Sequence, residues 1–186
     1  MRYLGIDPGT TNLGFAIVEN NRFLYVGVTK LNNKNSLKKE IHKFAKYITN
    51  LYGPFEKVGI ERQMTGKMRV VACHLSYAFN NAYLIRPQNV KSYFMYSSIK
   101  SYKSRKKVGI EKFMALCIEC KQKKLFRHVA NFKNKMDDVA DAALISWYIS
   151  AEPSATKDKQ NNGSSSDSWI RDNIWSVEDS QLVKNS

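Results

Sequence analysis

Four acidic residues of this chain stand where their carboxylates could act together: Asp7, Glu61, Asp138 and Asp141. Asp7 closes a strand-like segment before a Pro-Gly turn, and Glu61 closes a second apolar segment. Asp138 and Asp141 are three residues apart in a helical pattern, so they project from one helix face. If that helix lies across both strand ends, the four acids form a hard-oxygen site of the kind that holds Mg²⁺. Two such ions about 4 Å apart can activate water and stabilise the leaving oxygen in phosphodiester hydrolysis.

Each acid also has a purely structural interpretation. Asp7 can hydrogen-bond the turn that follows it, and Glu61 can pair with a lysine. Asp137 or Asp138 can stabilise the N-terminus of a helix. Spacing alone leaves both interpretations open.

The elements that must position these acids are readable from hydrophobic periodicity. Strand patterns over 2–7, 13–19 and 23–29, joined by short turns, predict a three-stranded antiparallel meander. A helical pattern over 36–51 leads to the apolar segment 57–61, which a right-handed crossover would lay parallel to the first strand. Further expected elements are a helix over 64–81, a strand over 83–86, a short helix from Pro87, and helices over 106–122 and 137–149. The expected class is α/β, a mixed five-stranded sheet of three antiparallel strands and a parallel βαβ unit, flanked by helices.

Charge divides the chain into two parts. The 186 residues include 30 Lys and Arg against 16 Asp and Glu, a formal net charge of +14, which predicts affinity for polyanions and first of all nucleic acid. Residues 1–151 hold most of the positive charge and are expected to form one globular domain. Residues 152–186 are polar, rich in Ser and Asn, and are expected to be a largely disordered tail.

Other classes of protein are disfavoured. The uncharged apolar run over 142–151 is well short of the roughly 18 to 20 residues that a membrane span needs. The N-terminus lacks the pattern of a secretory signal, and three cysteines fit a reducing compartment, so we expect an intracellular protein. Cys117 and Cys120 are spaced as C-x-x-C, but zinc would need two further ligands, and buried thiols are the favoured interpretation.

A basic segment follows the predicted fifth strand. It contains five cations in eight residues, with one more upstream: Lys100, Lys103, Arg105, Lys106 and Lys107, and before them Lys91. These residues can neutralise DNA backbone phosphates, which positions DNA without reading its sequence. The alternative is a solvated helix face. Aromatic residues interleave with this segment and either stack on unpaired bases or belong to the core: Tyr93, Phe94, Tyr96 and Tyr102.

These motifs, in this order, resemble those of the RuvC-like Holliday junction resolvases. They are Ile6-Asp7-Pro8-Gly9-Thr10 with Gly14 beyond it, Gly59-Ile60-Glu61-Arg62-Gln63, Pro87-Gln88-Asn89-Val90-Lys91, and Asp137-Asp138-Val139-Ala140-Asp141-Ala142. The likeness covers most of 1–150. The 101–107 segment and the Asp-Asp-Val-Ala-Asp run look closest to the poxvirus branch.

The resemblance implies a ribonuclease H-like fold and a homodimer that makes paired, symmetrical nicks in four-way DNA junctions. It implies two Mg²⁺ per active site, with Mn²⁺ as a substitute and no other cofactor, and a place of action where viral DNA replicates, in the host cytoplasm. It assigns Asp7, Glu61, Asp138 and Asp141 as metal-binding catalytic residues, and Lys91 and Lys107 as phosphate contacts. Asp137 is an extra acid, which either caps the helix or takes the place of Asp138.

Three alternatives stay open. One is a non-catalytic protein that binds branched DNA, and another is a different ribonuclease H-like nuclease, acting on RNA–DNA hybrids or in transposase-like strand transfer. A remote third is an ATP-binding phosphotransferase of the actin and Hsp70 type, because the turn at Asp7-Pro8-Gly9-Thr10 also looks like a phosphate loop. Such enzymes need two lobes, and a 151-residue body supplies one at most.

Overall fold

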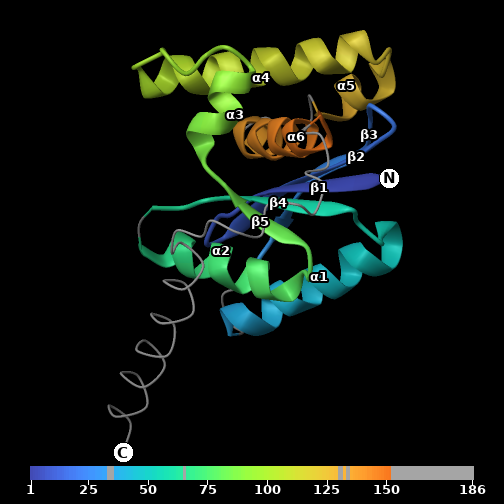
Figure 1. The fold of residues 1–186 in the computed structure, drawn as a ribbon, viewed down its shortest axis with the longest axis vertical. Coiled ribbons are helices and arrows are strands. Elements are labelled where there is room, and N and C mark those ends of the chain that lie inside the picture. The colour runs from blue at the N-terminus through green and yellow to red at the C-terminus, as the bar shows by residue number, and fades with distance from the viewer. Residues whose placement is uncertain (33–35, 65, 130–131, 133–134, 152–186) are drawn as a thin grey trace, which may run out of the picture. The chain divides into compact units, whose positions relative to one another are not determined.

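A computed structural model gives the fold (Figure 1) and describes residues 1–32, 36–64, 66–129, 132 and 135–151. The predicted tail, 152–186, lies outside these residues. The described part contains a five-stranded sheet in the order β3-β2-β1-β4-β5. Its strands are β1 (Arg2–Asp7), β2 (Asn12–Glu19), β3 (Arg22–Lys30), β4 (Lys57–Glu61) and β5 (Ala82–Ile85).

The first three strands are antiparallel, and β4 and β5 run parallel to β1. Asn20 and Asn21 form the turn between β2 and β3, and both have positive φ angles, of 51° and 56°. Asparagine tolerates that conformation, and a two-residue turn of this kind matches the natural twist of a hairpin. The predicted mixed sheet is therefore confirmed.

Helices cover both faces of the sheet (Figure 1). On one face, α1 (Leu37–Tyr52) and α2 (Gly66–Ala78) bury their apolar side chains against the strands. On the other face α6 (Met136–Ala151) lies on the sheet, and α4 (Tyr102–Glu119) packs over α6, joined to the sheet by α3 (Pro87–Tyr93). A short helix, α5 (Lys123–Val129), follows α4 and was not expected from the sequence.

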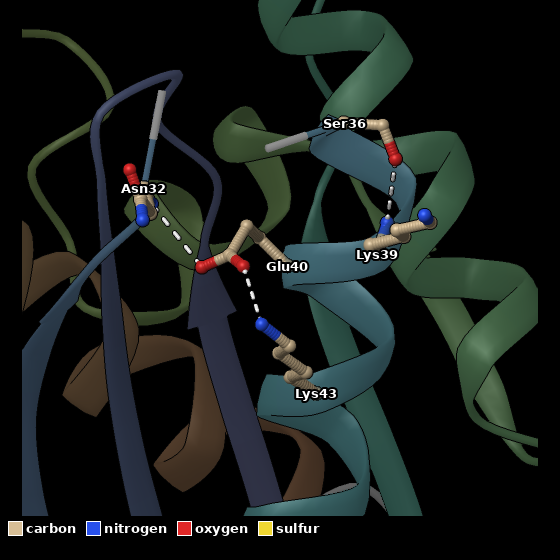
Figure 2. Close-up of polar contacts among 5 residues, drawn as sticks. All are labelled: Asn32, Ser36, Lys39, Glu40 and Lys43. Atoms are coloured by element: carbon tan, nitrogen blue, oxygen red, sulfur yellow. Dashed lines mark hydrogen bonds and ion pairs between the residues drawn. The ribbon is translucent and has the colours of Figure 1, made fainter. Parts of the chain in front are cut away.

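The start of α1 shows how one connection is fixed (Figure 2). The Ser36 hydroxyl caps the helix by accepting from the Lys39 backbone N–H at 3.3 Å. Glu40 accepts from the backbone N–H of Asn32 at 3.3 Å and pairs with Lys43 at 3.0 Å. These contacts join the end of β3 to the first turns of α1, as expected for an N-cap with an acid in the first turn.

Close approach of α6 to the sheet depends on glycine. A Cβ at Gly5 of β1 would overlap the Ala142 carbonyl oxygen, and one at Gly14 of β2 would overlap that of Asp138. The helix backbone therefore lies directly on the strands. Its first two turns are held next to the end of β1, where Asp7 is paired with Gly14.

The basic segment differs from its expected form. Helix α4 begins at Tyr102 instead of near 106, because the Ser101 hydroxyl accepts from the Ser104 backbone N–H at 3.4 Å and caps the helix there. Most of the segment therefore lies on the first turns of α4. Helix α2 is also shorter than the predicted 64–81.

Candidate active site

Asp7 and Glu61 end neighbouring parallel strands at the same edge of the sheet. Ile6 of β1 is paired with Ile60 of β4, so the next residue of each strand is an acid. The two carboxyl groups are within hydrogen-bonding reach of each other. Glu61 also accepts a hydrogen bond from Gln63 Nε2 at 3.0 Å. The parallel pairing thus brings together two acids that are far apart in sequence.

Helix α6 brings Asp138 and Asp141 to the same edge. Burial raises the pKa of Asp7 well above its usual value, and the negative charges of Glu61, Asp141 and Asp138 raise it further. Burial and then Glu61 raise the pKa of Asp141 to about 7. Each of the two buried aspartates therefore senses acids from other elements, so all four predicted acids face one region.

The chemistry of this donor set fits a hard divalent cation. In the described part of the chain, no three acidic, His or Cys side chains already surround one point at ligand distances. Four carboxylates nevertheless share one partly buried region, and the ammonium groups of Lys91 and Lys106 offset the charge of Asp141 only in part. Oxygen ligands that repel one another are stabilised by a cation between them.

Asp137 is engaged differently from Asp138. The ammonium of Lys106 bonds to the Asp137 carboxylate and also lies 5.0 Å from the centroid of the Tyr102 ring. Burial opposes ionisation of Asp137, but the bond and charge of Lys106 bring its pKa below the usual value. Asp138 lies 3.5 Å from the ammonium of Lys135 and, unlike Asp137, acts on Asp7. The two neighbouring acids thus have different partners.

The six predicted DNA-binding cations fall into three groups. Lys91 on α3 and Lys106 on α4 lie close enough to the acids for their charges to lower the pKa of Asp141. Arg105 donates to the carbonyl oxygens of Ile99 at 3.2 Å and Lys100 at 2.7 Å, so its guanidinium orders the connection before α4. The remaining three side chains are exposed: Lys100, Lys103 and Lys107.

Tyr96 lies at the acid site, whereas the sequence analysis named it only as an aromatic residue of the basic segment that either stacks on bases or belongs to the core. Only 4% of its surface is exposed, and burial followed by the charges of Asp141 and Glu61 raises its pKa. An ideal Cβ at Gly109 of α4 would lie 3.6 Å from Asp141 Oδ1 and 3.8 Å from the Tyr96 hydroxyl. Tyr96 therefore belongs to the wall of the acid site. No local pattern marks it, because its neighbours come from α4 and α6.

Burial distinguishes the roles of the remaining candidate residues, the aromatics of the basic segment and the cysteines. Phe94, like Tyr96, packs in the core, whereas Tyr93 and Tyr102 remain exposed. Cys117 is a buried thiol whose pKa burial raises to about 12, and Cys120 is also a free thiol. The described residues offer these two cysteines no set of metal-binding partners. Nor is any described helix both long and apolar enough to cross a bilayer.

Comparison with known proteins identifies the relatives of this chain. A family model described as "Poxvirus A22 protein" matches residues 2–150. The chain belongs to the poxvirus A22 family. The resemblance to the poxvirus branch of the RuvC-like resolvases is thereby confirmed. A search of curated proteins finds no match.

Solved structures place this A22-family chain among known folds. The yeast mitochondrial Holliday junction resolvase Ydc2 is similar over 78% of this chain and 77% of its own, with 17% identity and a TM-score of 0.55. Thermus thermophilus RuvC is similar over 80% of this chain and 92% of its own at 20% identity. Its TM-score is 0.49 alone and 0.47 in a complex with a Holliday junction substrate. The likeness to Ydc2 supports the predicted ribonuclease H-like fold.

Proposed function

We propose that this A22-family protein is an endonuclease that resolves four-way DNA junctions by paired, symmetrical nicks. The observation that carries the proposal is the meeting of Asp7, Glu61 and Asp141 at one edge of the sheet, beside the cations of α3 and α4. Acids alone would repel DNA, and cations alone would only bind it. Their adjacency provides both a metal site and a place for a phosphate, which favours a nuclease over a protein that only binds DNA.

Asp7, Glu61, Asp138 and Asp141 would hold two Mg²⁺ ions, or Mn²⁺ in their place. When bound, the metal would supply positive charge that activates water and stabilises the leaving oxygen of the cut phosphodiester. Asp7 and Glu61 are fixed by strands, and the other two acids by α6, so the ligands come from rigid elements. Asp137 stays outside the set because Lys106 binds its carboxylate.

The cations orient the DNA. Lys91 and Lys106 lie near the acids and would hold the phosphate to be cut, while Lys100, Lys103 and Lys107 would bind its neighbours along the strand. Arg105 acts indirectly by ordering the chain that carries Lys100. All these contacts go to the backbone and therefore select DNA shape without selecting its sequence.

Two chains are needed for two cuts. The described residues of one chain form one acid cluster, and a junction with two-fold symmetry must be nicked at two related positions. A homodimer with C2 symmetry would place one site on each of two strands. As a poxvirus-family protein, it would act in the host cytoplasm, where the viral DNA replicates.

The deciding experiment compares an immobile four-way junction, a linear duplex and an RNA–DNA hybrid, each with and without Mg²⁺. We expect paired symmetrical nicks in the junction alone and only with metal. Asp7→Asn and Asp141→Asn should abolish cleavage and preserve junction binding, since the basic residues remain. Cutting of the hybrid would favour another ribonuclease H-like nuclease, and binding without any cutting would favour a DNA-structure binder. Light scattering would give the oligomeric state.

A further inference from the structure

A basic hollow lies at the end of the sheet away from the acids. Its volume is about 550 Å³, and cationic and imidazole side chains line it above an apolar floor: Arg22, Lys121, Lys124 and His128 over Phe23 and Leu125. No acidic side chain lines it among the described residues. Arg22, Lys121 and Lys124 are exposed, so their charges are available to a partner. We call this feature the distal basic hollow.

The hollow has a rigid frame. Gln122 Oε1 accepts from the Phe23 backbone N–H at 2.9 Å, and Gln122 Nε2 donates to the Phe23 carbonyl at 2.7 Å. Nearby, Cys120 Sγ donates to the Asn21 carbonyl at 3.2 Å. These contacts join the end of α4 to the β2–β3 turn. The cations of the two segments therefore face one space.

Helix α4 connects the distal basic hollow to the acid site. Near its start Lys106 bonds to Asp137, and just beyond its end Cys120 contacts the β2–β3 turn. The helix has 18 residues, a length of about 27 Å at 1.5 Å per residue. The strand register agrees, because Arg2 pairs with Glu19 beside the turn while Asp7 pairs with Gly14 at the far end.

We propose that the distal basic hollow binds backbone phosphates of the same DNA arm whose other end enters the acid site. This inference rests on the proposed function. At about 3.4 Å per base pair, 27 Å corresponds to about 8 base pairs from the cut. Between the two ends the exposed acid Glu111 lies 3.8 Å from Lys107. The proposed contacts are therefore two groups of cations, one at each end of α4.

The structure favours a polymer with regularly spaced phosphates over a small anion. The cations sit on two segments around an open, wide space, and Lys100, Lys103 and Lys107 at the far end of α4 have the same character. A duplex arm can satisfy both groups at once. A free phosphate could occupy only one of the two groups of cations. If the hollow bound only a free phosphate, the length of the DNA arm would not affect binding there.

The test uses the full chain in metal-free buffer, so that the DNA stays intact. The variant is Lys121→Ala/Lys124→Ala. The control is Lys38→Ala/Lys46→Ala, which removes the same charge from exposed positions of α1 on the opposite face of the sheet. Each is titrated with four-way junctions whose arms have about 16 base pairs, or about 5 base pairs closed by hairpin loops.

On long arms, the hollow variant should bind severalfold more weakly than the parent, and its salt dependence should fall by about two counterions. On short arms the hollow variant should bind as tightly as the parent. The α1 control should bind as tightly as the parent on both arm lengths. Equal losses on both arm lengths, or no loss on long arms, would overturn the inference. If the parent cuts junctions but the hollow variant binds long arms as well as the parent does, only the DNA-binding role of the distal basic hollow is refuted. If the parent neither prefers nor cuts junctions, the proposed function is refuted as well.

Discussion

The ammonium of Lys106 on α4 is bonded to the carboxylate of Asp137 at the start of α6. This pair joins the outer helix to the helix that carries two of the proposed ligands. The two adjacent acids have different neighbours: Asp137 bonds to Lys106 and acts on Asp141, while Asp138 lies 3.5 Å from Lys135 and acts on Asp7 at the end of β1. Because Lys106 occupies the Asp137 carboxylate, we propose Asp138 as the metal ligand and Asp137 as a positioning residue.

Neighbouring acids should thus respond differently to the same change. Asp138→Asn is expected to lower junction cleavage by at least about a hundredfold, because a ligand is lost, and Asp137→Asn by less than about tenfold. Single-turnover cleavage at saturating enzyme measures both. Junction binding without metal should be unchanged in the two variants. Equal losses of cleavage would mean that both acids bind metal.

The stability of the metal-free protein should fall as pH rises. Burial and Glu61 raise the pKa of Asp141 to about 7, with Asp137 adding to the effect and Lys91 and Lys106 opposing it. The folded state therefore holds a proton more tightly than the unfolded state does, and stability is lost as pH rises from about 4 to about 7. Asp141→Asn removes the carboxyl group whose ionisation destabilises the folded state at higher pH.

Thermal unfolding in EDTA checks the prediction. At about pH 8, Asp141→Asn should melt at least about 3 °C above the parent, and the difference should shrink at about pH 5. Glu56→Gln, which removes an acid from an exposed position just before β4, serves as a charge control. A pH-independent difference would show that Asp141 does not lie among other acids.

The salt dependence of junction binding tests whether Lys107 contacts a phosphate. Its side chain is 79% exposed, and its pairing with Glu111 at 3.8 Å is a surface ion pair of little energetic value. Lys107→Ala should weaken junction binding and lower the salt dependence by about one counterion. Lys46→Ala on α1 is the matched control. A salt dependence equal to that of the parent would show that Lys107 touches no phosphate.

The contact of α6 with the sheet can be tested by adding one methyl group. Gly14→Ala would place a Cβ on the Asp138 carbonyl and should destabilise the fold by about 1 to 3 kcal/mol, with loss of cleavage as α6 moves. Gly109→Ala is the control, because its Cβ meets nothing closer than 3.6 Å and alanine favours a helix. Urea denaturation of both should show opposite or clearly unequal changes.

The sheet and the position of Asp7 and Glu61 at the same edge of it were predictable, because both follow from short-range periodicity and the crossover rule. Four features were not. The seven residues of α5 are too few for a periodic apolar pattern to show, and the start of α4 is crowded with cations that oppose the helix dipole. Tyr96 and the bond between Lys106 and Asp137 arise from tertiary packing, which spacing along the chain does not encode.

The acids of the site stand at positions 7, 61, 138 and 141, so the first half of the chain supplies only two of them. A polypeptide still emerging from the ribosome exposes the strands and the first lysines before α6 has been made. Such a nascent chain carries cations that can attract nucleic acid but lacks two of the four proposed metal ligands. If the four acids hold the metal as proposed, cleavage has to wait until α6 has been synthesised and has packed on the sheet.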